Sequence, residues 1–267
     1  MTKVITFAIQ KGGSGKTTML YNFGEWLAQK YKVLLIDLDY QSSLSEAYEL
    51  YDAENTSLGI FTGEEVEFHH VKENLSIIPA TYALEDIPLQ LRATGVQDVY
   101  FLLEDWLYEH SEEILKYDFL LIDTHPDTLT VTQNAIATSQ YQIGVLEPSE
   151  FGYNAKQKSL TSLEELKMKT FNRRTKENRV TTKMIFLGNK LRQNESLTHS
   201  FLKEVEKDDD VIALIPRKTL FEQSTYQKIP VCEQLKDTNI LSRNGNRAFA
   251  ERLEVEYNKI LTIISED

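Results

Sequence analysis

Apolar runs of strand length alternate with helical patterns along the whole chain. The runs are rich in valine, isoleucine and leucine without strict alternation, as expected of strands buried on both faces of a sheet. This order predicts an α/β fold in which a mostly parallel, twisted sheet carries helices on both faces. The expected strands cover residues 3–9, 32–38, 75–80, 118–124, 141–147, 183–189 and 211–216, and the expected helices cover 16–30, 97–115, 129–138, 151–169, 196–207 and 246–264.

Nothing in this pattern predicts a division of the chain. The 267 residues include no repeat and no linker rich in glycine, proline or serine, and one large α/β domain accommodates this length. We therefore expect a single domain over residues 1–267, without an N-terminal helix-turn-helix domain. The last helix mixes acids with a few bases on its polar positions, whereas a membrane-surface helix needs a basic polar face. We expect it to pack on the core.

Composition narrows the classes of protein that remain. No apolar run approaches the ~18 residues that a membrane span needs, and the first residues enter a strand instead of forming a signal peptide. The single cysteine, Cys232, excludes an internal disulfide and a metal cluster held by the cysteines of one chain. We expect a reduced, cytoplasmic setting.

The stretch FAIQKGGSGKTT (residues 7–18) has the composition of a phosphate-binding loop between a strand and a helix. Its glycines allow successive backbone N–H groups to turn inward around a phosphate, and the helix N-terminus adds its positive end. Lys16 would reach the β- and γ-phosphates, and the Thr17 hydroxyl would ligate Mg²⁺. The predicted nucleotide-binding residues are Lys11, Gly12, Gly13, Ser14, Gly15, Lys16, Thr17 and Thr18.

This loop departs from the common pattern G-x-x-x-x-G-K-[ST] at its start. Gln10 occupies the position of the first glycine, and an additional lysine, Lys11, follows it. Phosphate binding by the loop does not by itself explain Lys11, because Lys16 would already contact the β- and γ-phosphates.

Acidic residues follow two of the expected strands. Asp37 and Asp39 end the run LLIDLD, and Asp123 ends the run FLLID. The carboxyl ends of parallel strands line the crevice where ligands bind. Beside a phosphate loop, carboxylates there are suited to holding Mg²⁺ through water and to orienting an attacking water.

These motifs together resemble the deviant Walker A, Walker A′ and Walker B motifs of the ParA/MinD family of dimerising ATPases. The segments that carry the resemblance are KGGSGKTT, VLLIDLDYQSSLS and DFLLIDTHPDTLTVTQNA. It continues through LEPSEFGYNA and VIALIPRKTLFEQSTYQKIPV, and the last segment is similar to ParA-type partition proteins. The resemblance covers nearly the whole chain.

The resemblance implies ATP and Mg²⁺ as cofactors, ATP hydrolysis, and a homodimer in the ATP state. It makes Lys11 the signature lysine, which reaches the partner's nucleotide phosphates across the dimer interface. Asp39 would position or activate the attacking water, and Thr17 and Asp123 would hold Mg²⁺, the latter through water. Asn189 falls where some relatives contact adenine by an asparagine side chain.

Two positions depart from the family's motifs. The A′ motif usually reads Asp-Pro-Gln, whereas this chain has Tyr40 after Asp39. Walker B usually ends Asp-Thr-Pro-Pro, whereas this chain has His125 as the second residue after Asp123. Tyrosine lacks the backbone constraint of proline, so we expect Tyr40 to affect the hydrolysis rate more than ATP binding. His125 is open to two interpretations, a proton-handling group or a turn residue without a catalytic role.

The net charge of −12 does not favour nucleic acid, but one segment has the opposite character. Residues 167–192 hold many lysines and arginines and one acid, Glu177. This segment is either a solvated loop and helix end or a surface that contacts DNA phosphates. The candidate DNA-binding residues are Arg173, Arg174, Lys176, Arg179, Arg217 and Lys218, with Arg243 and Arg247 after them.

The function that the resemblance favours is DNA partition. The ATP-bound dimer would bind DNA non-specifically on the nucleoid and move a plasmid or chromosome together with a ParB-like centromere-binding partner, away from membranes. The alternative is a MinD-like ATPase that positions a membrane or polar protein complex. A metal-cluster protein would need more than Cys232, and a bacterial tyrosine kinase would be expected to end in a tyrosine cluster, where this chain has Tyr257 alone.

Overall fold

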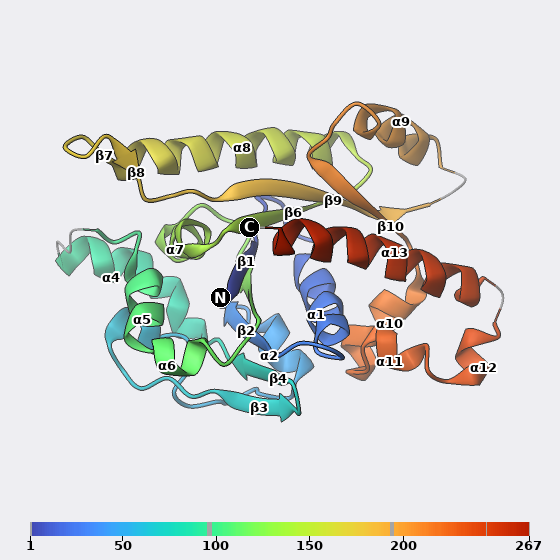
Figure 1. Ribbon diagram of the computed structural model, residues 1–267, viewed down its shortest axis with the longest axis horizontal. Helices are drawn as coiled ribbons and strands as arrows, with labels where there is room; N and C mark the ends of the chain where they lie inside the picture. The colour runs from blue at the N-terminus through green and yellow to red at the C-terminus, as the bar shows by residue number, and fades with distance from the viewer. Residues whose placement is uncertain (1, 95–97, 193–194, 244, 267) are drawn as a thin grey trace.

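The computed structural model describes residues 2–94, 98–192, 195–243 and 245–266 (Figure 1). A central eight-stranded sheet runs through it in the order β10-β9-β6-β1-β5-β2-β4-β3. Its strands are parallel to their neighbours except β3, which pairs with β4 in the antiparallel sense. The strands are β1 (Lys3–Phe7), β2 (Val33–Leu38), β3 (His69–Lys72), β4 (Leu75–Ile78), β5 (Phe119–Thr124), β6 (Tyr141–Leu146), β9 (Lys183–Leu191) and β10 (Val211–Pro216), and a separate hairpin consists of β7 (Phe171–Asn172) and β8 (Glu177–Asn178).

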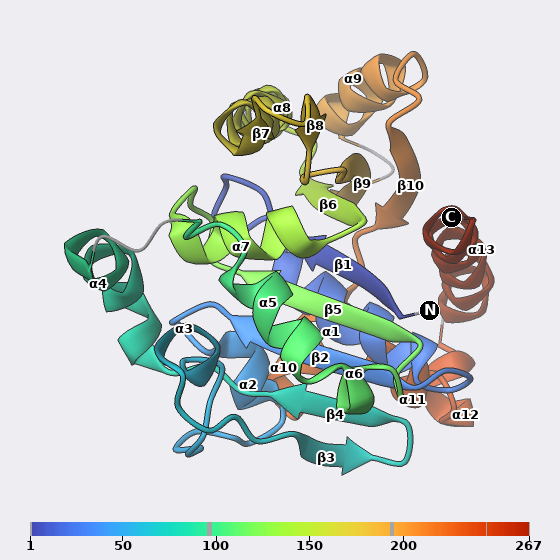
Figure 2. The same ribbon diagram turned by 60° about the vertical axis from the view of Figure 1, so that its left-hand side comes forward.

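Helices cover both faces of the sheet (Figures 1 and 2). One face carries α1, α2, α10, α11 and α13, and the opposite face carries α3 to α9. The helices are α1 (Lys16–Leu27), α2 (Ser43–Ala47), α3 (Gly59–Thr62), η1 (Tyr82–Asp86), α4 (Ile87–Thr94), α5 (Leu102–Glu109), α6 (Ser111–Ile114), α7 (Thr130–Thr138), α8 (Glu150–Thr170), α9 (Ser196–Val205), α10 (Thr219–Gln227), α11 (Val231–Gln234), α12 (Thr238–Leu241) and α13 (Asn246–Ser265).

Side chains of successive residues in the central strands point alternately into the hydrophobic cores on the two faces of the sheet. In β5, Leu121 packs in the core that includes α1 and α13, whereas Leu120 and Ile122 pack in the core beneath α5 and α7. All three are fully buried. A strand buried on both faces has no polar side to alternate with, which explains the continuous apolar runs of the sequence.

The predicted α/β fold, with its mostly parallel sheet and helices on both faces, is therefore confirmed. Each expected strand is present, with its ends shifted by at most two residues. The edge strand β3 and the hairpin β7–β8 were not predicted, because both are short and half exposed. The helix expected over 97–115 is divided into α5 and α6, and its first residue lies outside the described part of the chain.

The last helix packs on the core as expected. Phe249, Leu253, Tyr257 and Ile260 of α13 are buried, and the ring of Tyr257 meets that of Phe23 of α1 edge to face at 5.2 Å. In the described residues, no helix combines the length and the apolar character needed to cross a membrane.

Candidate functional site

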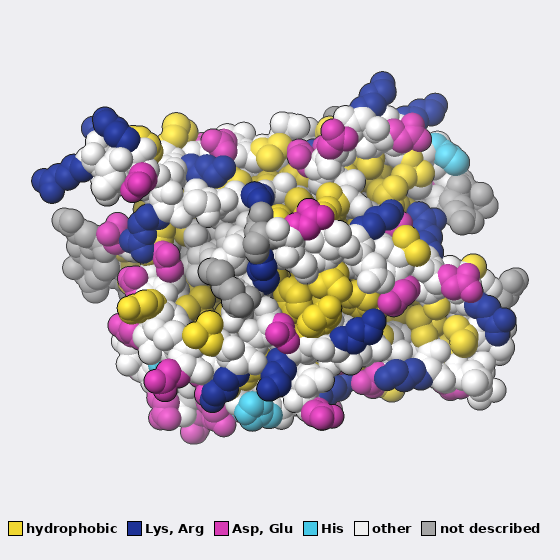
Figure 3. All heavy atoms as spheres, viewed as in Figure 1, with side chains coloured by type: hydrophobic (Ala, Val, Ile, Leu, Met, Phe, Trp, Pro, Cys, Tyr) yellow, Lys and Arg dark blue, Asp and Glu magenta, His cyan; other side chains and the backbone are white. Residues whose placement is uncertain are grey.

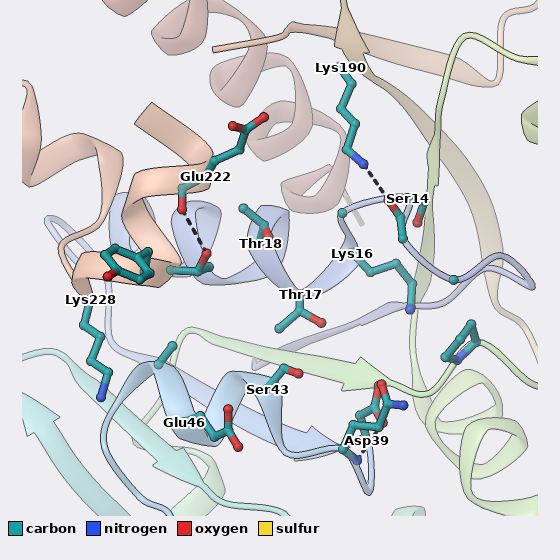
Figure 4. Close-up of a pocket in the computed structure, with 18 of the residues that line it drawn as sticks. Ser14, Lys16, Thr17, Thr18, Asp39, Ser43, Glu46, Lys190, Glu222 and Lys228 are labelled. Carbon is teal, nitrogen blue, oxygen red and sulfur yellow. Dashed lines mark hydrogen bonds between the residues drawn. The ribbon is translucent and has the colours of Figure 1, made fainter. Parts of the chain in front are cut away.

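A cleft of about 720 Å³ opens at the carboxyl ends of the central strands, beside the N-terminus of α1 (Figure 4). The β1–α1 loop forms one wall, and the β2–α2 connection and α10 form the others. Figure 4 shows that Lys16 and Thr17 of α1 face the cleft together with Asp39, which follows β2. The lining residues are Gly12, Gly13, Ser14, Gly15, Lys16, Thr17, Thr18, Asp39, Gln41, Ser43, Glu46, Ala47, Tyr51, Pro126, Lys190, Glu222, Thr225, Tyr226 and Lys228.

The glycines of the loop satisfy two backbone constraints. Gly13 and Gly15 have φ angles of 73° and 93°, in the left-handed region that glycine adopts at little cost. Gly15 is also the N-cap of α1, and a Cβ there would lie 2.7 Å from Nδ2 of Asn189. The loop therefore exposes its backbone at a helix N-terminus, where anions bind.

Strand register brings the acidic residues together at one edge of this cleft. Asp37 of β2 stands opposite Asp123 of β5, and both are fully buried. The Thr17 hydroxyl donates a hydrogen bond of 2.6 Å to Oδ2 of Asp123. Within the described residues, Oδ1 of Asp123 is buried without a hydrogen-bond partner. An unpaired carboxylate oxygen beside a threonine hydroxyl is a donor set that fits Mg²⁺.

The two buried carboxyls have raised pKa values. Burial, followed by the negative charge of Asp123, raises the pKa of Asp37 to about 8, although Ser45 donates two hydrogen bonds to its Oδ2. Burial also raises the pKa of Asp123 to about 6, against the opposing effect of the Lys16 charge. Asp37 accepts hydrogen bonds from Ser45 of α2 and from the backbone N–H of Asp39. It therefore connects the loop that carries Asp39 to the first turn of α2.

Asp39 is buried in the wall of the cleft. Its side chain lines the cavity, and its Oδ1 accepts a 3.0 Å hydrogen bond from the backbone N–H of Gln41. Its own N–H donates to Oδ1 of Asp37 over 3.1 Å. These local bonds fix the carboxylate at the end of β2, and among the described residues no hydrogen bond engages its Oδ2.

Lys11 makes its contacts within its own chain. Its Nζ donates to Oε2 of Glu147 at 2.7 Å and to the hydroxyl of Ser149 at 3.1 Å. The second oxygen of Glu147 accepts a hydrogen bond from Lys190, which also donates to the Gly13 carbonyl. Burial alone would raise the pKa of Glu147, but the hydrogen bonds from Lys11 and Lys190 outweigh it and lower that pKa. Sequence reasoning assigned no role to Glu147 or Lys190, although Glu147 lies in the motif LEPSEFGYNA.

Asn189 packs directly against the phosphate loop. Its Nδ2 donates to the Ser14 carbonyl at 3.0 Å, and its side chain lines a small cavity of about 70 Å³ with Pro216 and Phe221. Its contact with adenine stays a prediction. The same cavity adjoins Glu222, which also lines the large cleft.

The candidate DNA-binding residues fall into two groups, one at the β7–β8 hairpin and the other after β10, which are well separated in Figure 1. Arg173, Arg174 and Lys176 are exposed at the turn of the β7–β8 hairpin, and Figure 3 shows basic side chains projecting there. Arg179 is engaged within the chain instead. Its guanidinium lies 3.7 Å from the centroid of the Phe101 ring and pairs with Glu104 at 2.7 Å.

The second group borders a groove of about 750 Å³ between β10 and α13. Figure 3 shows lysine and arginine side chains between α9 and α13. Arg217 pairs with Glu222 at 2.9 Å, which connects the groove to the nucleotide cleft. The lining residues are Leu191, Arg192, Pro216, Arg217, Lys218, Thr219, Gly245, Ala248, Phe249 and Arg252, with no acid among them.

The parallel sheet, the glycine-rich loop at the start of α1 and the acidic strand ends define a nucleotide-binding protein of the P-loop class. A family model described as an AAA domain matches residues 2–177. The chain belongs to this family, and within it to the ParA/MinD type of ATPase.

Two curated relatives are similar to this chain over different lengths. The uncharacterized protein MJECL24 of Methanocaldococcus jannaschii is 30% identical over 240 residues, which cover 85% of this chain and 90% of the relative. The virulence plasmid ParA family protein pGP5-D of Chlamydia psittaci is 32% identical over 164 residues, which cover 58% of this chain and 61% of that protein. The second match therefore spans less than two thirds of either protein.

A solved structure shares the fold over nearly its full length. The ATP complex of a McdA variant from Cyanothece superposes with a TM-score of 0.76 at 21% identity, covering 97% of this chain and 96% of that one.

Proposed function

We propose that this chain is a Mg²⁺-dependent ATPase that dimerises with ATP, binds DNA without sequence preference and takes part in plasmid or chromosome partition with a ParB-like partner. The observation that supports it most is the meeting of three motifs at one cleft. The glycine-rich loop, Thr17 and Asp39 line the same cavity, Thr17 donates a hydrogen bond to the buried Asp123, and Lys11 is held beside the loop by Glu147.

The phosphates of ATP would lie against the β1–α1 loop. Its backbone N–H groups and the N-terminus of α1 supply the positive field, and Lys16, which is 6% exposed, supplies the compensating charge. Thr17 and Asp123 would hold Mg²⁺, which neutralises charge on the β- and γ-phosphates when bound. The base would extend toward Asn189 and Pro216, beside the small cavity.

Hydrolysis would depend on Asp39. Because its Oδ1 is occupied by the Gln41 N–H, Oδ2 is the oxygen suited to accept a hydrogen bond from the attacking water. Its own N–H bond to Asp37 holds the carboxylate in place before substrate arrives.

Dimerisation would depend on the release of Lys11. In this conformation its ammonium is paired with Glu147 of the same chain at 2.7 Å. To contact a partner's nucleotide, Lys11 must exchange this carboxylate for the phosphates, which carry more negative charge. The γ-phosphate would then favour the dimer, and hydrolysis would remove that contact.

DNA would bind through the groove between β10 and α13. The basic residues there lie on one surface, and the ion pair of Arg217 with Glu222 places them next to the nucleotide cleft. The hairpin turn with Arg173, Arg174 and Lys176 would provide a second contact. Arg179 is less suited to this role, since its guanidinium already stacks on Phe101 and pairs with Glu104.

Binding to unrelated duplex DNA across a salt series, with ATP or ADP, tests this proposal. The informative variants are Lys218→Glu/Arg252→Glu in the groove and Arg173→Glu/Arg174→Glu in the hairpin. The control is Lys30→Glu/Lys32→Glu, which changes the net charge by the same amount at two exposed residues that follow α1. Each lost phosphate contact lowers the slope of log K against log salt by about 0.9.

We expect ATP-dependent binding whose salt slope falls in the groove variant and is unchanged in the control. Absence of DNA binding by the ATP-bound dimer would refute DNA as the partner. Equal binding with ATP and ADP would refute its ATP dependence, and binding that neither basic variant weakens would refute the proposed surface. Loss of DNA binding in a variant is interpreted only if the variant still dimerises with ATP, because the proposal assigns DNA binding to the dimer.

A further inference from the structure

Two loops separate the nucleotide cleft from a second, smaller cavity of about 170 Å³. In the loop after β2, Asp39 and Gln41 line the cleft, whereas Tyr40 between them lines the smaller cavity. In the loop after β5, Pro126 lines the cleft and His125 lines the smaller cavity. Tyr40 and His125 therefore lie on the side of these loops that faces the smaller cavity, and Asp39 lies on the side that faces the nucleotide cleft.

The rings of Tyr40 and His125 stack on each other. Their centroids are 4.3 Å apart with an angle of 28° between the planes, and Tyr82 of η1 packs edge-on against Tyr40 at 6.0 Å. His125 is held from its other side, where Nδ1 donates to Oδ2 of Asp127 at 3.0 Å. Asp127 in turn accepts a 2.8 Å hydrogen bond from the hydroxyl of Thr132 in α7. The stack thus connects the loop after β2 to the start of α7.

The two stacked residues occupy the positions where this chain departs from the usual A′ and B motifs. Each replaces a proline, whose ring would restrict the backbone of its loop. We propose that Tyr40 and His125 are positioning residues for hydrolysis, and that their stack holds the Asp39 loop in place of the missing prolines. The inference rests on the hydrolytic role proposed for Asp39.

The hydrogen bonds of Asp39 explain how the stack would act on it. The backbone N–H of Gln41 holds Oδ1 of Asp39 at 3.0 Å, and Tyr40 lies between these two residues in the chain. When the Tyr40 ring loses its partner, the loop gains freedom, and the carboxylate no longer keeps one orientation. The phosphate loop lies on the opposite wall, so ATP binding is expected to change little.

The test is a double-mutant cycle on ATP hydrolysis with Tyr40→Ala, His125→Ala and the double variant. His125→Phe is the conservative variant, because it keeps a stacking ring and loses only the bond to Asp127. Tyr82→Ala removes a neighbouring ring from the same cluster without breaking the stack. Asp39→Ala tests the underlying role, and the melting temperature and the Kd for a fluorescent ATP analogue report on folding and binding.

We expect kcat to fall about threefold to tenfold in each single alanine variant, the range that the loss of one aromatic pair predicts. KM and analogue affinity should change less than about twofold, and the double variant should be no slower than the slower single variant. His125→Phe should recover most of the lost kcat, and Tyr82→Ala should keep it.

The inference is overturned if Asp39→Ala abolishes hydrolysis while the alanine variants keep full kcat, or if their effects are independent in the double variant. It is also overturned if His125→Phe is as slow as His125→Ala. Full activity in Asp39→Ala would instead refute the proposed role of Asp39, and the inference with it.

Discussion

Replacing Glu147 by glutamine is expected to strengthen ATP-dependent dimerisation. The substitution keeps the shape of the side chain and removes the charge that holds Lys11 at 2.7 Å and pairs with Lys190. Lys11 would then reach a partner's phosphates without first leaving a carboxylate. Only molecules in which Lys11 has left Glu147 can form the dimer contact, so the apparent affinity of dimerisation falls with the fraction of molecules in which the two residues are paired.

The size of the effect follows from the burial of this pair. The side chains of Lys11 and Glu147 are 20% and 21% exposed, so the pair is expected at the upper end of the range for surface ion pairs, about 1 kcal/mol. A symmetric dimer releases two such pairs, which gives about 2 kcal/mol and therefore roughly a 30-fold lower Kd of dimerisation.

Sedimentation velocity with a slowly hydrolysed ATP analogue measures this Kd. Glu164→Gln is the matched control, because Glu164 pairs with Lys167 at 3.1 Å on the exposed face of α8, and it should leave the Kd unchanged. A Kd for Glu147→Gln that is equal to or higher than the wild-type value, at an unchanged melting temperature, would contradict the reasoning. It would show that Glu147 orients Lys11 for the partner instead of restraining it.

Three further predictions concern the cleft itself. Gly15→Ala should abolish ATP-analogue binding in a fluorescence titration, because φ is 93° there and the new Cβ would lie 2.7 Å from Asn189. Thr17→Val removes the hydroxyl bonded to Asp123, so the Mg²⁺ dependence of nucleotide affinity, measured by calorimetry with and without EDTA, should be lost. The raised pKa of Asp37, about 8, means that without metal and nucleotide the native chain binds more protons than the unfolded chain. The free energy of unfolding in urea should therefore fall from about pH 4 to pH 8, and this fall should be smaller in Asp37→Asn.

Much of the fold could be predicted because the strands are buried on both faces. The apolar residues of the run FLLID in β5 do not alternate with polar ones, so the pattern predicts that adjacent residues such as Leu120 and Leu121 are both buried, as they are. The phosphate loop was equally accessible to sequence reasoning, since its residues are contiguous and Gly13 and Gly15 have the backbone angles that glycine supplies. The position of Asp123 followed from its place at the end of a strand.

The pairings between distant segments could not be predicted. Lys11 and Glu147 are 136 positions apart, and nothing in either segment specifies their contact. The stack of Tyr40 on His125 likewise appears only when β2 and β5 lie side by side. The sequence identified Lys11 as unusual but not Glu147; it identified both Tyr40 and His125 as unusual but not their contact, which the sheet order supplies.

The central claim is that ATP and Lys11 together produce a dimer. Light scattering during size-exclusion chromatography of the Asp39→Ala variant, with ATP and Mg²⁺ or with ADP, tests it most directly, since this variant should retain bound ATP. We predict about twice the chain mass of 30.8 kDa with ATP, the mass of one chain with ADP, and one chain under both conditions once Lys11→Ala is added. One mass for all samples, whether monomer or dimer, would contradict the account.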